Sequence, residues 1–273
     1  MPFYDIIIQK EKPMHRHKKI SNRAKRISAF ASIAFLYVLW FFISKYIDSH
    51  MPYNLILPSP NLVVKRVIEL LGKSSTYFII SSSFLRLFIA IAFSFLSAVV
   101  IGTAASLSQT FEAFMRPYVS SVRAIPVASM LIVILLWIGA KNAPIVICAM
   151  VVFPVFYEMI LESIKNMEKS FVEVISLDSN FSFFVFRKVY LPAIANNLFI
   201  SFVQSIGLGF KVLVMSELIA YTENSIGKKI YTSKLNLDIE GVFAWTIIII
   251  FIVMIIEWVF RRVKKSYDLS QSQ

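Results

Sequence analysis

The stretch Glu173–Pro192, EVISLDSNFSFFVFRKVYLP, is the one long segment between two strongly apolar runs that is neither membrane-like nor a plain connector. Its first residues favour a helix, and a polar Asp-Ser-Asn cluster at 178–180 is typical of a turn. Apolar residues then return at helical spacing, at Phe181, Phe184, Val185 and Val189. The pattern predicts a helix, a turn and a second helix whose surface suits the docking of a partner.

The spacing of this segment resembles the signature loop of ABC-importer permeases: Glu-Ala-Ala, three residues, Gly, nine residues, then Ile-x-Leu-Pro. Serine accepts a positive φ less readily than glycine, so the reversal is expected one position later, at Asn180. The resemblance implies a cytoplasmic helix-turn-helix coupling loop that docks into an ATPase. Val174 and Ile175 stand in the two Ala places, Ser179 in the Gly place and Val189 in the Ile place, so three small residues of the signature are larger here. The residues at the signature positions, together with Asn180, are the predicted ATPase-coupling residues: Glu173, Val174, Ile175, Ser179, Asn180, Val189, Leu191 and Pro192.

The composition indicates an integral membrane protein. Of the 273 residues, 58% are apolar and 25 are phenylalanine, which exceeds the usual content of soluble domains. A net charge of +12 could suggest nucleic-acid binding, but the basic residues gather at the two ends and in the docking segment. Membrane topology explains that distribution better, and no nucleic-acid partner is expected. The single cysteine, Cys148, lies in an apolar run and is expected to be a buried, inert thiol.

Apolar runs predict about six membrane-spanning helices, because a crossing needs about 20 residues. The predicted fold is therefore an all-α integral membrane protein, which the resemblance assigns to the type I ABC importer permease kind. We expect a basic cytoplasmic tail at 1–27, one transmembrane domain at 28–261 with the coupling loop at 164–192, and a cytoplasmic tail at 262–273. The runs are Ser28–Ile47, Leu87–Leu107, Val127–Ala140, Ala143–Tyr157, Val189–Phe210 and Val242–Ile256.

The distribution of lysine and arginine predicts the orientation of the chain. With both termini inside, 17 of these residues fall in cytoplasmic segments and nine in outer segments. Positive residues favour the cytoplasmic side of a membrane. We therefore expect a multi-pass protein of the plasma or inner membrane with cytoplasmic termini and a cytoplasmic coupling loop.

A short amphipathic helix is predicted to precede the second span. Ser59 can cap it, Pro60 suits its first position, and Gly72 suits its end after Leu71. Its apolar and charged residues lie on opposite faces, which indicates a position at the membrane surface. The opening sequence, Leu57-Pro58-Ser59-Pro60, is similar to that of permeases in the nitrate, sulfonate and taurine branch.

Five residues are candidates for a translocation pathway: Arg123, Pro126, Gln204, Lys211 and Glu217. Residues 123–126 resemble an Arg-Pro-Ile-Pro stretch of the family, and Pro126 either lines a pore or kinks a helix entrance. An ionisable residue inside a span is a functional candidate by default. Lys211 either attracts an anionic solute or marks the end of a span. Six residues apart on a helix, Lys211 and Glu217 point in different directions, so each needs another partner.

Three further charged residues have two readings each. Arg86 is either an anchor at the membrane interface or the counterpart of an arginine that members of the resembled family carry at this place. Glu158 and Glu162 lie one helical turn apart, and they either pair with Lys165 or Lys169 beside the docking segment or form a hydrated helix end.

No feature of the sequence predicts chemistry in this chain. Gly72-Lys73-Ser74 resembles the end of a phosphate-binding loop, but Val67 stands where the first glycine is needed. The three histidines, His15, His17 and His50, form no metal-ligand cluster, and no nucleophile and base occur together. We expect no catalytic residue, no metal site and no cofactor bound by this chain, with ATP and Mg²⁺ acting through a partner ATPase.

These observations predict the permease subunit of an ATP-driven ABC importer. The resemblance implies a cytoplasmic ABC ATPase dimer, an extracytoplasmic binding protein and a second copy of the permease as partners, all within a lipid bilayer. The cargo expected for the branch is a nitrate-, sulfonate- or taurine-like anion or a pyrimidine-type vitamin precursor. The alternative is a secondary transporter driven by an ion gradient, which predicts inverted repeats that the sequence does not display convincingly.

Overall fold

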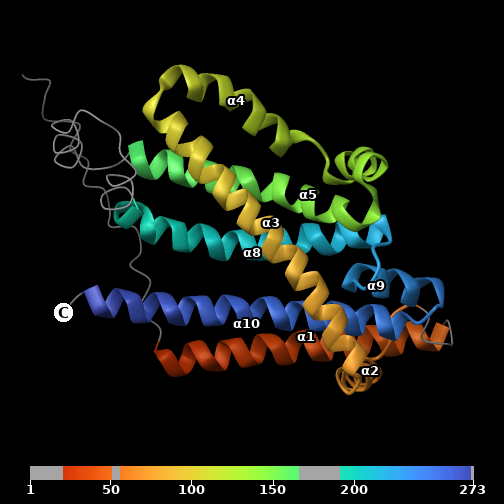
Figure 1. Cartoon of the computed structure of the whole chain (residues 1–273). Helices are drawn as coiled ribbons and strands as arrows, with labels where there is room; N and C mark the ends of the chain where they lie inside the picture. The colour runs from red at the N-terminus through yellow and green to blue at the C-terminus, as the bar shows by residue number, and fades with distance from the viewer. Residues whose placement is uncertain (1–20, 51–55, 166–190, 272–273) are drawn as a thin grey trace, which may run out of the picture. The chain divides into compact units, whose positions relative to one another are not determined.

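The computed structural model describes residues 21–50, 56–165 and 191–271, and all regular structure in these ranges is helical (Figure 1). The chain divides into two units, Met1–Pro60 and Asn61–Gln273, and each is described by itself. The predicted all-α fold is confirmed for this part of the chain. The helices are α1 (Asn22–His50), α2 (Pro60–Leu71), α3 (Ser74–Leu107), α4 (Gln109–Ala124), α5 (Val127–Lys165), α8 (Leu191–Ala220), α9 (Ile226–Leu235) and α10 (Ile239–Gln271).

Helix α1 makes up most of the described part of the first unit. It has 29 residues, more than the approximately 20 that a crossing requires. Its large apolar side chains are mostly exposed, including Phe30 and Phe42. The Ser44 hydroxyl donates a hydrogen bond of 2.9 Å to the carbonyl oxygen of Leu57. A helix with this surface fits a hydrocarbon environment, as the sequence predicts for its first span.

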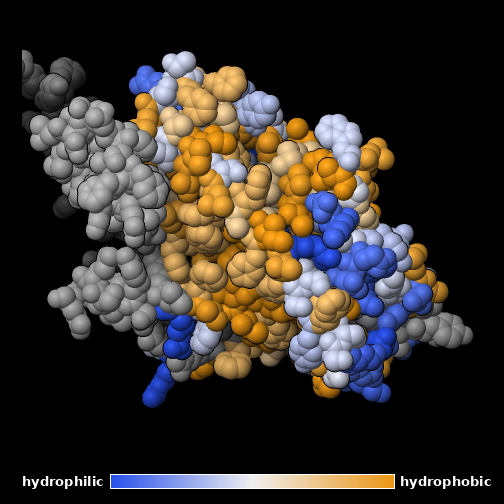
Figure 2. Space-filling view, viewed as in Figure 1, coloured by the Kyte–Doolittle hydropathy of each residue, from blue (hydrophilic) through white to orange (hydrophobic). Residues whose placement is uncertain are grey.

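Five helices in the described ranges are long and apolar enough to cross a membrane: Phe30–His50, Ser74–Leu107, Val127–Lys165, Asn197–Ala220 and Ile239–Phe260. About six were expected, and the difference lies in α5, which contains two of the predicted spans. Figure 2 shows a broad hydrophobic area where Figure 1 places α3, α5 and α8, and hydrophilic residues gathered near α9. The structure therefore has the polarity pattern of a membrane protein.

Helix α5 is interrupted at Gly139. This glycine has φ 76° and ψ 168°, a backbone conformation that a residue with a Cβ adopts only with strain. The break falls near the end of the predicted span Val127–Ala140, and the predicted span Ala143–Tyr157 begins after it. At 1.5 Å per residue the section 127–138 is only about 18 Å long, whereas the section 140–165 is about 39 Å long and can cross a bilayer.

Helix α4 was not predicted from the sequence. It connects α3 to α5, contains Pro117, and buries only Val119 completely. Ile125 ends it in an extended conformation, as expected of a residue that precedes a proline, and α5 starts after Pro126. The predicted interruption of the chain at Pro126 is therefore confirmed, and a helical segment lies on each side of it.

Helix α5 packs along both α3 and α8 and forms the centre of the second unit. Close approach depends on small residues: a Cβ added at Gly102 would lie 3.2 Å from Ile160 Cγ2, and one at Gly209 would lie 3.2 Å from Val152 Cγ2. Cys148 is fully buried, as expected, and its thiol donates to the Gly209 carbonyl oxygen. Packing between small residues is typical of helix contacts in membranes.

Two ends of this helix bundle are distinguished by their contacts. At the first, Asn197 Nδ2 of α8 donates to Ser163 Oγ of α5 at 2.8 Å, close to where residues 166–190 leave α5. At the second, the Thr222 hydroxyl donates 2.7 Å to the carbonyl oxygen of Ala140. We call these the loop end and the α9 end. The distance along α8 from Asn197 to Ala220 is about 34 Å, enough to cross the hydrocarbon core.

Helix α2 has the predicted bounds and buries one face through Val63 and Leu70. Its Arg66 donates 2.6 Å to Asp238 and 3.0 Å to Glu69. These carboxylates raise the pKa of Arg66, so the guanidinium stays charged. Asp238 also accepts a 2.8 Å bond from the Gly241 amide, which caps the first turn of α10.

Replacement of Asp238 by alanine is expected to lower the free energy of unfolding by about 1 to 2 kcal/mol, because the cap and the partner of Arg66 are both lost. Thermal unfolding in detergent measures the change. Asp238→Asn keeps an oxygen for the Gly241 amide, so its loss should be smaller. Equal losses in the two variants would show that the cap contributes nothing.

Candidate functional site

The predicted coupling residues cannot be assigned a geometry. Glu173, Val174, Ile175, Ser179, Asn180 and Val189 lie outside the described residues. Leu191 and Pro192 are the first residues of α8, and only their helical backbone is described. The docking of an ATPase on this segment therefore stays a prediction.

One face of α8 is exposed along the helix, although its other faces are packed. Gln204, Leu208, Lys211 and Met215 share this face at spacings of four, three and four residues, and all four are exposed. We call these four residues the α8 stripe. Phe210, between them in sequence, points the other way and is fully buried. Two predicted pathway residues, Gln204 and Lys211, are thus brought together on a single exposed face.

Lys211 is the charged member of the α8 stripe. The helix rises about 21 Å from Asn197 to Lys211 and about 9 Å from Lys211 to Glu217, so the ammonium belongs to the interior part of the span. Within the described ranges, Lys211 makes no ion pair or side-chain hydrogen bond. A cation in that position costs several kcal/mol unless it faces water, an anion or a partner protein.

Glu217 lies on the opposite side of α8 and has no exposed surface. Its carboxylate accepts bonds of 2.9 Å from Ser83 Oγ, 3.1 Å from Arg86 Nη1 and 3.3 Å from the Gly227 amide. We call Ser83, Arg86, Glu217 and Gly227 the Glu217 cluster. A buried carboxylate is tolerated when a cation and several donors satisfy it, and this one has both.

The Glu217 cluster joins three segments at the α9 end. Arg86 on α3 also donates to the carbonyl oxygens of Glu223, at 2.8 Å, and Asn224, at 3.2 Å. Ser83 Oγ accepts from the amide of Ile226 at 3.1 Å. Gly227 lies so close to α8 that an added Cβ would be 2.4 Å from the Leu218 amide nitrogen. The cluster therefore fixes the turn between α8 and α9 onto α3.

This arrangement changes the roles expected from the sequence. Arg86, which could have been an interface anchor, is instead the partner of Glu217. Lys211 and Glu217 point apart, as their spacing predicted, and Glu217 presents no carboxylate surface to a solute in this chain. Sequence reasoning missed Ser83 and Gly227, because 134 positions separate Ser83 from Glu217 and no local pattern links them.

The other two pathway candidates lie at the junction of α4 and α5. Arg123 is in the last turn of α4 and forms an ion pair with Glu158 of α5, and Pro126 is exposed just beyond it. Lys165 pairs with Glu112 of α4 at 2.5 Å. Of the two readings for Glu158, a pair with Lys165 is not formed, because α4 supplies a partner of opposite charge to each residue; Lys169 lies outside the described residues.

A polar pocket of about 870 Å³ opens beside these pairs at the loop end. Charged and amide side chains line it, including Glu112 and Arg116 from α4 and Lys165 from α5. Such a surface is suited to water and to polar or charged groups. It lies where the undescribed docking segment leaves α5.

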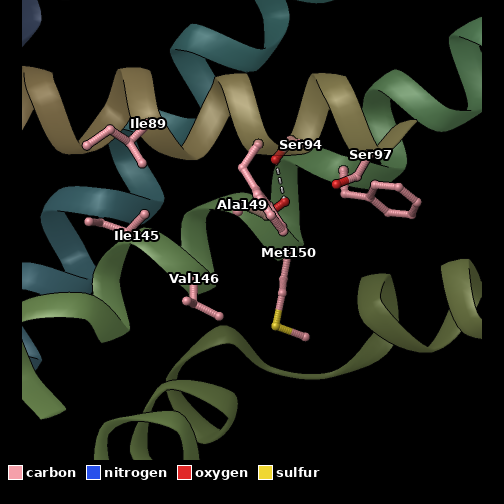
Figure 3. Close-up of a pocket in the computed structure, with 9 residues that line it drawn as sticks. Ile89, Ser94, Ser97, Ile145, Val146, Ala149 and Met150 are labelled. Atoms are coloured by element: carbon pink, nitrogen blue, oxygen red, sulfur yellow. Dashed lines mark hydrogen bonds between the residues drawn. The ribbon is translucent and has the colours of Figure 1, made fainter. Parts of the chain in front are cut away.

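A second, smaller cavity of about 280 Å³ lies between α3 and α5 (Figure 3). The Ser94 hydroxyl donates 2.7 Å to the carbonyl oxygen of Ala149 and is thereby satisfied. The remaining walls are almost entirely apolar, so the cavity suits an apolar group and not a charged solute. Its lining residues are Ile89, Phe93, Ser94, Ser97, Ile145, Val146, Ala149, Met150 and Phe153.

Nothing in the described part of the chain is arranged to hold a metal, since no three His, Cys, Asp or Glu side chains lie together there. Comparison with protein families gives one match: the family described as binding-protein-dependent transport system inner membrane component matches residues 90–268. The matched range includes the α8 stripe and the junction at Pro126, whereas Ser83 and Arg86 precede it. A search of curated proteins finds no match to the chain.

Proposed function

Because the chain belongs to the family of binding-protein-dependent transport system inner membrane components, we propose that it forms the translocation pathway of an ATP-driven importer for a small solute. Members of this family are permease components of ABC transporters and not enzymes. The observation that supports a pathway is the α8 stripe, which exposes Gln204 and Lys211 within a span. Polar groups at membrane depth are stable where they line a water-filled cavity or contact protein.

The pathway is completed by a second copy of the permease. The α8 stripe and the exposed Pro126 junction cannot face lipid at low cost, and in one copy nothing described covers them. A two-fold arrangement would bring two stripes to face one another around a central passage, since closed symmetric dimers are the commonest assemblies. The apolar helix α1 and the outer surface of α3 would then contact lipid.

The loop end is proposed to be cytoplasmic, with both chain termini on that side of a plasma or inner membrane. The support is the count of lysine and arginine, 17 against nine. In this orientation residues 173–192 reach a cytoplasmic ABC ATPase dimer. The α9 end then faces a substrate-loaded binding protein outside the membrane. ATP and Mg²⁺ would bind the ATPase, whose closure would rock α5 and α8 through the docked segment.

The cargo is proposed to be a small solute of the nitrate, sulfonate and taurine kind or a pyrimidine-type vitamin precursor. The support is the similarity of Leu57-Pro58-Ser59-Pro60 to the opening of permeases in that branch. The rival, an ion-driven transporter, would need Lys211 and Glu217 in one midplane site. That site is disfavoured because the two side chains lie on different faces of α8. Uptake of nitrate, methanesulfonate or taurine by vesicles that lack ATP would support the rival.

A labelling experiment tests the coupling loop without knowledge of the cargo. In a Cys148→Ala background, Ser179→Cys should react with a membrane-impermeant maleimide in inside-out vesicles only. Co-expression of the partner ATPase should reduce that reaction at least about fivefold, because docking covers the loop. Asn236→Cys, in the exposed turn after α9, should react in right-side-out vesicles and should be indifferent to the ATPase. Labelling of Ser179→Cys from the outside, or no protection by the ATPase, would overturn the proposal.

A further inference from the structure

We propose that the α8 stripe is a selectivity site for a negatively charged solute, with Lys211 as the residue that recognises the charge. The inference rests on the proposed function, and it narrows the cargo to anions over uncharged precursors. It follows from the surroundings of each charge in the spans of the second unit.

The other described charges away from the ends of these spans have partners. Lys141, Glu162 and Glu240 form no ion pair or side-chain hydrogen bond in the described ranges, but each lies within three residues of a helix end or of the break at Gly139. Arg86 pairs with Glu217 at 3.1 Å, and Glu158 pairs with Arg123. Glu257 on α10 also has an interaction. Lys211 differs from them: it is exposed, and no acidic group in the described ranges lies within ion-pair distance of it. A positive charge is thus left available on the surface that the proposed pathway uses.

The neighbours of Lys211 strengthen its attraction for an anion. Leu208 and Met215, one turn to either side on the same face, are apolar and exposed. A charge beside low-dielectric walls interacts more strongly than the same charge in open water. Gln204, about two turns away, adds an amide that can donate hydrogen bonds to anionic oxygens. One cation, apolar walls and an amide donor together suit a small oxyanion.

The direction of the side chain argues against a lysine that only marks the span end. The nearer end of α8 is its C-terminus, at Ala220. In a helix, Cα–Cβ bonds tilt toward the N-terminus. The Lys211 side chain therefore starts away from the near end and toward Gln204. To reach water near Ala220, the Lys211 side chain would have to turn back against this direction. It can extend along the α8 stripe into a pathway without turning back.

The test measures the local potential by the chemistry of an introduced thiol. Leu208→Cys in a Cys148→Ala background places the thiol about 5 to 6 Å from Lys211 on the same face. In proteoliposomes holding the full chain with its ATPase, two methanethiosulfonate reagents are compared, one carrying a sulfonate and the other a trimethylammonium group. At low ionic strength Lys211 should favour the anionic reagent, so Lys211→Gln should lower the anion-to-cation rate ratio about tenfold.

Two controls make the result specific. Lys211→Arg keeps the charge and should keep the ratio. At Asn236→Cys, beyond α9, Lys211→Gln should leave the ratio unchanged. Any effect of Lys211 on the ionisation of the thiol itself cancels, because both reagents react with the same thiolate.

The outcomes separate this inference from the proposed function. A ratio at Leu208→Cys that stays within about twofold after Lys211→Gln would overturn the inference, and so would a thiol that reacts with neither reagent. Either result leaves the protection of Ser179→Cys by the ATPase unaffected, since that labelling does not involve α8. Loss of the ATPase protection with an intact rate ratio would instead reject the importer and retain an anion-selective stripe.

Discussion

Substitution of Arg86 by methionine is expected to lower the free energy of unfolding by about 3 kcal/mol or more. Methionine preserves much of the side-chain volume but leaves the fully buried Glu217 carboxylate without its cation. It also removes the donors to the carbonyl oxygens of Glu223 and Asn224. Breaking one partner of a buried pair is costly because the remaining charge stays out of water. Chemical unfolding of the purified protein in mixed micelles measures the loss.

A double substitution distinguishes the ion pair from simple packing. Glu217→Gln removes the charge but keeps a carbonyl oxygen for Ser83 Oγ and the Gly227 amide. The variant Arg86→Met/Glu217→Gln should therefore be more stable than Arg86→Met alone, by about 1 to 2 kcal/mol. If the two losses simply add, the side chains are not energetically coupled and the role given to the pair is wrong.

Lys211→Met is the matched control for removal of a span cation. Lys211 has no ion-pair partner in the described ranges and is exposed, so its removal should change the stability by less than about 0.5 kcal/mol. Replacement of a cation by methionine is thus expected to lower the stability strongly at Arg86 and only slightly at Lys211. Arg86 is therefore expected to contribute to the stability of the bundle, and Lys211 to its selectivity for the solute.

Local signals in the sequence predicted the elements that depend on local physics. The cap-like Ser59-Pro60 and the terminal Gly72 located α2. The length of the apolar runs located α1 and the part of α3 from Leu87 onward. Helix α3 begins earlier, at Ser74, because its polar residues Ser83 and Arg86 are satisfied by distant partners. In the sequence, where these partners are not visible, Ser83 and Arg86 resemble the boundary of a span.

The site depended on contacts that the sequence could not reveal. Helix α4 carries Glu112, Arg116 and Arg123, so its composition resembles neither a span nor a connector. The charges of Glu112 and Arg123 are compensated by α5 only in the folded chain. In the sequence Gln204 and Lys211 are separate candidates, although their spacing of seven residues puts both on one face of a helix. What the spacing could not supply was the exposure of that face and the burial of Glu217 on the other.

Gly227→Ala is the second variant with a large expected effect. An added Cβ would lie 2.4 Å from the Leu218 amide nitrogen, 2.6 Å from the Val214 carbonyl oxygen and 2.6 Å from Glu217 Cβ. Two of these are backbone atoms of α8 that cannot rotate away, so α9 must shift and the Gly227 amide loses its bond to Glu217. We expect a loss of about 3 kcal/mol in the free energy of unfolding.

The physical cause of that loss can be separated from a general cost of replacing glycine. At Gly72 the nearest atoms to an added Cβ are 3.6 Å away, so Gly72→Ala should change the stability by less than about 0.5 kcal/mol. Displacement of α9 also disturbs the segment that Arg86 holds, so Arg86→Met should cost less in the Gly227→Ala background than alone. Full additivity, or equal effects at the two glycines, would mean that close packing of α9 on α8 does not support the buried ion pair.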